Sequence, residues 1–344
     1  MSSRGLILLT GASGFIAKHI ASQLLEAGYH VRASVRSLSR SQEVIDAVRP
    51  TLGDSSNLDS RLSFVALDLA NDQGWDDAAT GVDAVMHTAS PFPTVQPSDE
   101  QEIIRPAVDG VLRALNAAHR AGVRRVVMTS STAAITNTAL QPGRRALDER
   151  DWSQLSGPRA TPYVKSKTLA ERAAWDFVEK EAPEIGLTAI NPGFAVGPPL
   201  DAHYGTSLKA IERLLRGADP MLPNFGYASV DVRDVATAHV LALGNAQAIG
   251  NRLICGDQFL WYIEMARILK AAYPDRSIAT RKAPAILVRL LALFDKSIGT
   301  ILPNLDHEER ITCDRARSML GINFRDVRTS LKETAEYLIG NGLV

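Results

Sequence analysis

The stretch Leu6-Ile-Leu-Leu-Thr10-Gly11-Ala12-Ser13-Gly14-Phe15-Ile16-Ala17 determines the fold that we expect for this chain of 344 residues. Its first five residues form an apolar run that is typical of a buried strand, and Ile16, Ile20 and Leu24 follow at helical spacing. A strand, a glycine turn and a helix in this order point free backbone N–H groups and the positive helix end at an anion. Because glycines also let a pyrophosphate approach the backbone, the stretch predicts a dinucleotide-binding turn. A purely structural turn is the alternative, since the spacing is Thr-Gly-x-x-Gly-x-x-Ala and not Gly-x-Gly-x-x-Gly.

The second expected strand, His30 to Val35, indicates which dinucleotide binds. An acidic residue at its end would hold the two ribose hydroxyls of NAD, but the sequence continues with Arg36, Ser37 and Arg40. Two guanidinium groups at this point could bind a 2′-phosphate through charge-assisted hydrogen bonds. The pattern therefore favours NADP over NAD. The alternative is that both arginines are solvated loop charges.

The next two strand ends carry polar residues that could contact the same ligand. The third strand ends at Asp68 and Leu69, where the carboxylate could accept a hydrogen bond from the adenine amino group. The fourth strand, Ala84 to Met86, continues into His87-Thr-Ala-Ser-Pro91, and ligands of open parallel sheets lie beyond such carboxyl ends. His87 could be a catalytic base, although a histidine buried at a strand end is more commonly a hydrogen-bonded structural residue.

The fifth expected strand, Arg125 to Thr129, is followed by Ser130, Ser131 and Thr132. Their hydroxyl groups emerge at the same sheet edge as the glycine turn and could hydrogen-bond a substrate carbonyl. Serines at a strand end also cap turns, which is the structural alternative.

A helix opens at Thr161-Pro-Tyr163-Val-Lys165-Ser-Lys167 and contains the pattern Tyr-x-x-x-Lys. The four-residue spacing places Tyr163 and Lys167 on one helix face, so a phenol and an ammonium group can serve one site. A free tyrosine has a pKa near ~10, and a nearby cation favours the phenolate and lowers that pKa. Tyr163 could then protonate an alkoxide that develops on a substrate. The alternative is a surface pair without a function.

Alternating strands and helices continue to a sixth strand, Leu187 to Ile190, which leads into Asn191-Pro192-Gly193. This alternation predicts an α/β fold with a doubly wound parallel sheet of the Rossmann type. Beyond Leu200 the alternation stops, and short helices with one more strand pair, around 227–230 and 252–255, predict a smaller C-terminal lid that binds substrate. We therefore expect a cofactor domain at 1–195, to which a strand and a helix return from about 227–256, and a lid at 196–344.

The composition limits the partners and the compartment. Lysine plus arginine and aspartate plus glutamate both number 38, so the net charge of zero argues against nucleic acid and anionic membranes as partners. Cys255 and Cys313 show neither metal-ligand nor redox spacing, so we expect no metal site and a reducing compartment, with the cytoplasm as the default. The apolar run at 6–9 is too short for a signal peptide, and we expect no membrane span. A small molecule is the expected partner.

Five motifs, in this order and spacing, resemble the extended short-chain dehydrogenase/reductase family. They are Thr10-Gly11-x-x-Gly14-x-x-Ala17, Asp68-Leu69, Ser130-Ser131, Tyr163-x-x-x-Lys167 and Asn191-Pro192-Gly193. Further segments at 87–91, 170–175 and 230–236 are similar to the branch that holds plant dihydroflavonol 4-reductases and the yeast and bacterial aldehyde and ketone reductases. The resemblance covers nearly the whole chain.

The resemblance implies a mechanism and a set of site residues. Ser131 would hold the carbonyl oxygen, Tyr163 would protonate it, and Lys167 would bind the nicotinamide ribose and lower the pKa of Tyr163. Hydride would come from the nicotinamide of NADPH. The cofactor-binding residues that we expect are Gly11, Ser13, Gly14, Phe15, Ile16, Arg36, Arg40, Asp68, Leu69, Thr88, Ala89, Ser90, Pro192, Gly193 and Val196.

The expected activity is therefore the NADPH-dependent reduction of aldehydes or ketones. A mostly apolar pocket, lined by Phe92, Thr132, Phe194 and residues within 200–215, would suit a hydrophobic substrate. An epimerase or dehydratase that acts on a sugar nucleotide with bound NAD is the first alternative, and an NADP sensor without chemistry is the second. The long helices expected at 99–121 and 162–181 fit either a monomer or a homodimer.

Overall fold

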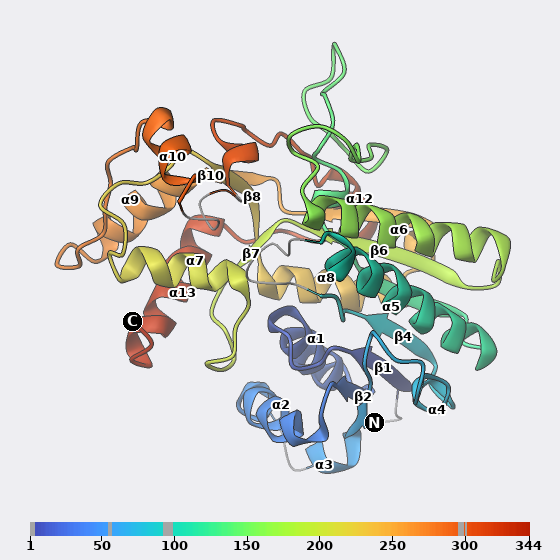
Figure 1. Cartoon of the computed structure of the whole chain (residues 1–344). Helices are drawn as coiled ribbons and strands as arrows, with labels where there is room; N and C mark the ends of the chain where they lie inside the picture. The colour runs from blue at the N-terminus through green and yellow to red at the C-terminus, as the bar shows by residue number, and fades with distance from the viewer. Residues whose placement is uncertain (1–3, 54–56, 92–98, 295–298, 300) are drawn as a thin grey trace.

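A computed structural model of the chain describes residues 4–53, 57–91, 99–294, 299 and 301–344. Within these residues, the largest unit is a parallel sheet of seven strands in the order β3-β2-β1-β4-β5-β6-β9 (Figure 1). The strands are β1 (Leu6–Thr10), β2 (His30–Val35), β3 (Leu62–Ala66), β4 (Ala84–His87), β5 (Arg125–Thr129), β6 (Gly186–Pro192) and β9 (Asn251–Cys255). The strand order reverses between β1 and β4, which is where ligands of such sheets bind. The predicted doubly wound parallel sheet is confirmed.

Alternate residues of the strands pack against helices on the two faces of this sheet. Ile7 and Leu9 belong to the core beneath α1 (Phe15–Glu26) and α8 (Val232–Gly244), which lie against each other. Leu8 belongs to the core beneath α5 (Gln101–Arg120) and α6 (Pro162–Lys180), which also lie against each other (Figure 1). Successive strand residues point to opposite faces, so a strand that is covered on both faces needs the unbroken apolar run found at 6–9.

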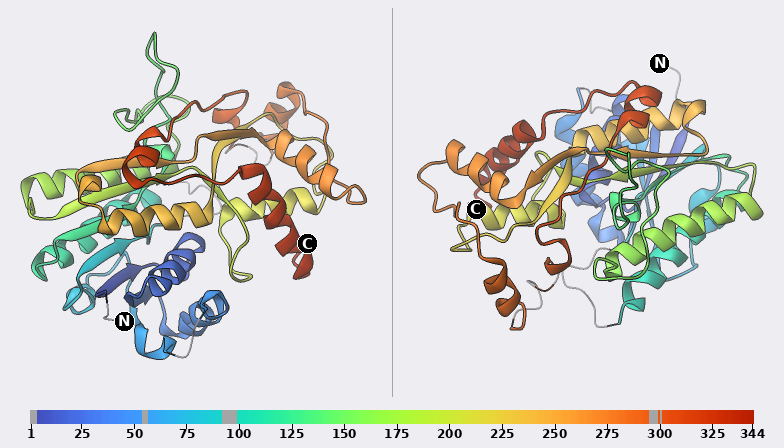
Figure 2. Two further views of the ribbon diagram at one scale, coloured as in Figure 1. Left: turned by 180° about the vertical axis from the view of Figure 1, so that it is seen from behind. Right: turned by 90° about the horizontal axis from the view of Figure 1, so that it is seen from above.

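The described residues also form a smaller sheet of three strands in the order β10-β8-β7. These are β7 (Phe194–Val196), β8 (Gly226–Asp231) and β10 (Gln258–Trp261). Helices α7 (Thr206–Leu215), α9 (Tyr262–Ala272) and α13 (Val327–Gly340) pack around their own apolar core on this side. Both views of Figure 2 place α9 and α13, coloured orange and red, on the opposite side of the molecule from the green helices α5 and α6.

The prediction that the segments near 227–230 and 252–255 pair with one another is wrong. β8 pairs with β7 and β10 in the smaller sheet, whereas β9 lies parallel to β6 in the large sheet. The chain changes sheets at Gly193, where a Cβ would lie only 2.1 Å from the carbonyl oxygen of Ala228 in β8. Because glycine has no side chain, β8 can approach this point and pair with β7 immediately after β6 ends.

Short helices connect these layers. They are α2 (Ser41–Val48), α3 (Leu58–Arg61), α4 (Trp75–Ala79), α10 (Ala285–Leu291) and α12 (Asp314–Leu320), together with the 3₁₀ helices η1 (Leu38–Arg40), η2 (Arg49–Thr51), η3 (Thr132–Ala134), η4 (Ala246–Ala248) and η5 (Leu302–Asn304). Across the described ranges, no helix combines the length and the apolarity that crossing a membrane requires.

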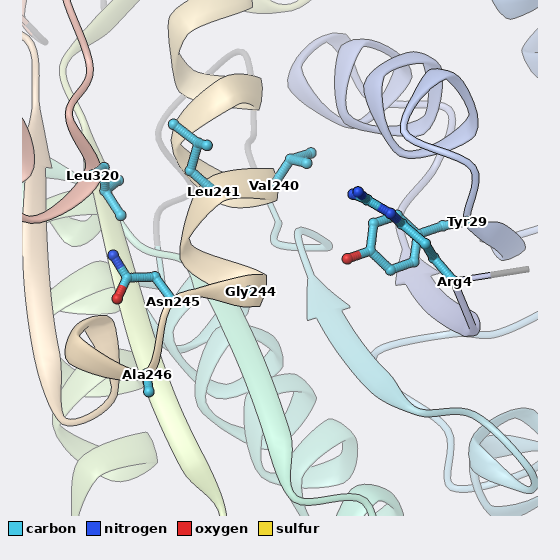
Figure 3. Close-up of a pocket in the computed structure, with 8 residues that line it drawn as sticks. All are labelled: Arg4, Tyr29, Val240, Leu241, Gly244, Asn245, Ala246 and Leu320. Carbon is cyan, nitrogen blue, oxygen red and sulfur yellow. The ribbon is translucent and has the colours of Figure 1, made fainter. Parts of the chain in front are cut away.

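A hollow of about 460 Å³ opens where β1 and β2 begin (Figure 3). It is lined by Arg4, Tyr29, Val240, Leu241, Gly244, Asn245, Ala246 and Leu320. Ligands of open parallel sheets lie beyond the carboxyl ends of the strands, and this hollow is at the amino ends. A ligand site is therefore expected at the opposite edge of the sheet.

Candidate active site

The glycine turn after β1 lies at the carboxyl edge of the large sheet. Gly11 has a φ of +67°, and a Cβ there would lie 2.8 Å from the Cα of Ala89. Only glycine suits both this left-handed backbone and the close approach of the loop after β4. The turn continues through Ser13 to Gly14, which caps α1 without a side-chain hydrogen bond, and the first turn of α1, beginning at Phe15 and Ile16, carries no acid. The amide groups of this helix end can therefore bind a pyrophosphate.

Thr10 ties this turn to the residues after β4. Its Oγ1 accepts hydrogen bonds from the amides of Thr88 and Ala89, both at 3.1 Å, and lies 3.0 Å from Nδ1 of His87. Burial, reinforced by the charge of Lys167, lowers the pKa of His87 to about 3. A neutral, buried, hydrogen-bonded imidazole matches the structural alternative for His87 and not the catalytic one.

The two arginines after β2 differ in whether another side chain already binds their guanidinium group. Arg36 is exposed and makes no hydrogen bond or ion pair with any part of the chain that the structure describes. Arg40 is held by Glu43, whose carboxylate accepts from its Nε at 3.0 Å and from its Nη2 at 3.1 Å. Arg36 is thus ready to meet a phosphate, whereas Arg40 would have to share its guanidinium group with Glu43.

Asp68 and Leu69 follow β3, at the end of the site farthest from Tyr163 in the strand order. Asp68 is exposed, and its Oδ1 accepts a hydrogen bond from the Ala70 amide at 3.0 Å. Leu69 is half-buried and packs on the core beneath α5. The carboxylate of Asp68 therefore remains accessible to a ligand, as the adenine contact requires.

Ser131, Tyr163 and Lys167 come together between β5 and α6. Thr161 caps α6 by accepting a hydrogen bond from the Val164 amide, which fixes the start of the helix just before Tyr163. The hydroxyl of Ser131 is hydrogen-bonded to Tyr163. Nζ of Lys167 lies 5.9 Å from the centre of the Tyr163 ring and donates to Oγ of Ser90 at 3.0 Å. The arrangement places two hydroxyl groups and one cation around one point at the sheet edge.

The expected lowering of the Tyr163 pKa by Lys167 is not seen. Burial raises the pKa of Tyr163, and the hydrogen bond from Ser131 opposes this only in part. Burial also lowers the pKa of Lys167 to about 8, against the effect of Glu171. Because the ammonium group points to Ser90 and loses part of its own stabilisation by burial, it does not offset the burial of the phenol.

The neighbouring residues Ser130 and Ser131 have different partners, because Ser130 belongs to a buried ionic network. The hydroxyl of Ser130 donates to Glu171, which is fully buried in α6. Glu171 also forms an ion pair with Nε of Arg252 in β9 at 2.6 Å and accepts from Nδ2 of Asn191 at 2.8 Å. Ser130 is therefore occupied by this network, whereas Ser131 faces Tyr163.

The predicted substrate-lining residues have different surroundings. Phe92 lies outside the described residues. Thr132 is buried at the start of η3, and the Phe194 ring stacks on Tyr227 with the ring centres 4.5 Å apart. The side chain of Val196 is fully buried in the core of the smaller sheet, so only its backbone is left for a ligand. Four residues of α7 in the expected 200–215 lining are buried in the apolar cores as well: Leu208, Ile211, Leu214 and Leu215.

The sequence profile of the NAD dependent epimerase/dehydratase family matches residues 7–256. The chain belongs to this family. The resemblance to the extended short-chain dehydrogenase/reductases is thereby confirmed. Within the epimerase/dehydratase family, the matched range runs from β1 through β9 and so includes every strand of the large sheet.

Named relatives share most of their length with this chain. The chain is 33% identical to a cinnamoyl-CoA reductase of Medicago truncatula, over 98% of both proteins. It is 30% identical to the ketoreductase azaE of Aspergillus niger, over 97% of both. A solved structure of the yeast methylglyoxal/isovaleraldehyde reductase Gre2 complexed with NADPH matches with a TM-score of 0.79 and 26% identity, over 98% of this chain and 100% of that one.

Lys18 in α1 is a buried charged residue that the sequence reasoning missed. Its buried ammonium group lies 2.6 Å from Oε1 of Glu43 in α2 and also bonds Asp201, in the segment before α7. Together with His203, these two carboxylates are the only group of possible metal ligands found in the described ranges, and Lys18 already pairs with both carboxylates. No local signal could have revealed the cluster, because Asp201 is 183 residues away in the sequence.

Proposed function

We propose that this protein is an NADPH-dependent reductase that converts aldehydes or ketones to alcohols. The observation that carries the proposal is the meeting of Ser131, Tyr163 and Lys167 beside an uncapped helix end at the switch point of the sheet. A hydroxyl donor, an acid and a cation around one point are the groups that carbonyl reduction requires. The relatives named as reductases, and the NADPH in the Gre2 structure, support the same activity.

The residues present fit NADPH. Gly11 lets the pyrophosphate approach the helix end, and Arg36 has a free guanidinium group where the 2′-phosphate would lie. The pair of Lys167 and Ser90 offers a cation and a hydroxyl group to the nicotinamide ribose. When bound, NADPH supplies the hydride. No acid follows β2 to hold the ribose hydroxyls of NAD, which speaks against the epimerase alternative.

The protein's own groups would hold and protonate the substrate oxygen. The Ser131 hydroxyl would hydrogen-bond the carbonyl and so orient it toward Tyr163. Because the pKa of Tyr163 is raised, the phenol is protonated at neutral pH and can give its proton to the alkoxide as it forms. Lys167, whose pKa of about 8 leaves it mostly charged at neutral pH, would then stabilise the phenolate that remains.

The test is the oxidation of NADPH, with NADH in parallel, against aldehydes, β-keto esters and aryl ketones. We expect turnover with NADPH and a loss of about 10² to 10⁴ in kcat/KM for Tyr163→Phe, since the variant lacks the proton donor. Tyr29→Phe, a tyrosine at the other edge of the sheet, is the matched control and should not change the rate. Full activity in Tyr163→Phe would refute the assigned acid, and no turnover by the wild type would refute the reductase.

The division of the chain and its setting belong to the same proposal. Residues 1–195, with α8 and β9, would bind the cofactor, and 196–344 would mostly bind substrate, which the separate cores of the two sheets support. The two buried free cysteines, Cys255 and Cys313, fit a reducing compartment such as the cytoplasm. We propose a monomer or a homodimer, in which α5 and α6 would form the contact.

A further inference from the structure

Lys18 is the buried centre of a chain of four charged side chains. Its Nζ donates to Oε1 of Glu43 in α2 at 2.6 Å and also to Oδ2 of Asp201, in the loop before α7. The same carboxylate of Glu43 accepts from Nε of Arg40 at 3.0 Å and from Nη2 at 3.1 Å. Arg40, Glu43, Lys18 and Asp201 therefore alternate in sign, and we call these four residues the charge chain.

The loop before α7 holds Lys18 in place from one side. Figure 1 shows this loop reaching from α7 toward α1 and α2. Tyr204 in the loop packs against the apolar cores of both sheets, and the carbonyl of His203 accepts from Nζ of Lys18 at 3.4 Å. A Cβ on Gly205 would lie 3.7 Å from the Cβ of Phe15 in α1, so the loop backbone runs close to the helix. This packing keeps the ammonium group of Lys18 beside Glu43.

The charge chain passes from the interior to the surface. The side chain of Lys18 is 2% exposed, that of Glu43 is 15% exposed, and that of Arg40 is 43% exposed. A lysine is buried to this degree only when it is paired. Burial acts to raise the pKa of Glu43, but the hydrogen bond and the charge of Lys18, followed by those of Arg40, hold that pKa below its usual range. Glu43 is therefore ionised at neutral pH, with Lys18 as its buried counter-charge.

An ionised acid in this position bears on the choice of cofactor. Glu43 directly contacts Arg40, one of the two arginines that we expect at the 2′-phosphate of NADPH. A carboxylate close to a phosphate repels it, whereas NADH has no charge at that point. Because Lys18 balances the charge of Glu43 from the buried side, the exposed guanidinium group of Arg40 keeps its positive charge available for a phosphate.

We propose that Lys18 is a positioning residue that sets the preference for NADPH over NADH by acting through Glu43. This role rests on the proposed use of NADPH and deepens it, because it names a residue beyond the cofactor contacts that controls the preference. With Lys18 present, Glu43 is neutralised in the interior and Arg40 can bind the 2′-phosphate. Without Lys18, Arg40 would have to neutralise Glu43, and the phosphate would meet an uncompensated carboxylate.

The test is a fluorescence titration of the wild type and Lys18→Met with NADPH and with NADH. Methionine replaces the ammonium group by an uncharged chain of similar length. We expect the Kd of NADPH to rise about fivefold and that of NADH to change less than about twofold, because only NADPH carries the phosphate that Glu43 repels. A purely structural lysine would weaken both cofactors alike, so the ratio of the two Kd values is the decisive quantity.

A rescue and a matched control separate the charge of Glu43 from damage to the fold. Adding Glu43→Gln to Lys18→Met removes the carboxylate that Lys18 neutralises, and it should return the Kd ratio to within about twofold of the wild type. Asp201→Asn breaks the other half of the same buried cluster but leaves Lys18 with Glu43, so it should keep the wild-type ratio. Thermal melts check that each variant is folded.

A second variant covers the case in which Lys18→Met does not fold, because Glu43 and Asp201 then repel each other in the interior. Lys18→Met with Asp201→Asn removes this repulsion and should still lose about fivefold in NADPH binding alone. An unchanged ratio in the folded Lys18 variant would overturn the proposed role. Equal weakening of both cofactors, a lack of rescue by Glu43→Gln, or the same shift in Asp201→Asn would overturn it as well.

Failure of the proposed function would look different. A wild type that binds NADPH no more tightly than NADH would refute the proposed use of NADPH before any variant is measured, and the role of Lys18 would fall with it. The titration needs no substrate, so an absence of carbonyl reduction would refute the reductase without changing the result for Lys18.

Discussion

At the proposed cofactor end of the site, Arg36 and Asp68 each follow the end of their own strand, whereas Glu309 meets Thr136 across 173 residues of sequence. The first kind of position is fixed by the strand that precedes it. The second depends on where a distant segment is held. A position of the first kind therefore stays in place when a distant segment changes, whereas one of the second kind does not.

The largest effect is predicted for the buried ionic network around Glu171. Glu171→Gln removes the buried partner of Arg252, which joins α6 to β9, and leaves Ser130 and Asn191 with a weaker acceptor. We expect the free energy of unfolding to fall by about 3–5 kcal/mol, because an unpaired charge stays buried. Urea denaturation measures it. Asp76→Asn, which breaks an exposed pair with Arg120, should cost less than about 1 kcal/mol, and equal losses would contradict the role of burial.

The second prediction concerns Gly193, the junction between the two sheets. A Cβ in Gly193→Ala would meet the backbone of Ala228, which no side-chain rotation can relieve, so we expect a loss of about 3 kcal/mol. Gly244→Ala at the end of α8, where a Cβ meets no atom within 4 Å, is the control and should change stability by less than about 1 kcal/mol. Thermal melts of both variants compare them, and a stable Gly193→Ala would show that the smaller sheet can move aside.

The third prediction concerns the pH dependence of the stability that the buried His87 produces. Burial lowers the pKa of His87 from 6.5 to about 3, so the folded state binds fewer protons than the unfolded state. The contribution of the neutral imidazole to the free energy of unfolding is complete above pH 6.5 and is lost as the pH falls toward 3. By pH 5 the free energy of unfolding has fallen by about 2 kcal/mol. His87→Gln should lose that much less between pH 7.5 and 5 in urea denaturation. An identical loss in the variant would argue against a neutral buried imidazole.

The smallest effect separates the two arginines of the cofactor edge. Arg36→Ala should weaken NADPH binding by about tenfold and leave NADH binding unchanged, because only NADPH carries the 2′-phosphate. Arg40→Ala should have a smaller effect, since Glu43 already holds that guanidinium group. Fluorescence titration with both cofactors measures this, and Arg49→Ala, an exposed arginine paired with Asp59, is the control. Equal effects on NADPH and NADH would contradict the assigned phosphate contact.

The sequence predicted the parts of the site that follow directly from a strand or a helix. The turn at Gly11, the serines after β5 and the Tyr163 helix all lie at the edge that their order implied, because parallel strands bring their carboxyl ends together. It could not predict the direction of the Tyr163 pKa shift. That direction depends on how deeply the phenol is buried and on the contact of Lys167 with Ser90, and neither follows from a four-residue spacing.

By itself, then, the sequence determined the large sheet, the glycine turn after β1 and the family, since each rests on local apolar periodicity and on short motifs with fixed geometry. Only the tertiary structure decided that β8 and β9 join different sheets, that Lys18 pairs with Glu43 and Asp201, and that Glu309 accepts hydrogen bonds from Thr136 and Ala228. The physical reason is that these residues are far apart along the chain. Hydrogen bonds and ion pairs between distant segments form wherever packing brings the groups together, and no local pattern in the chain records that meeting.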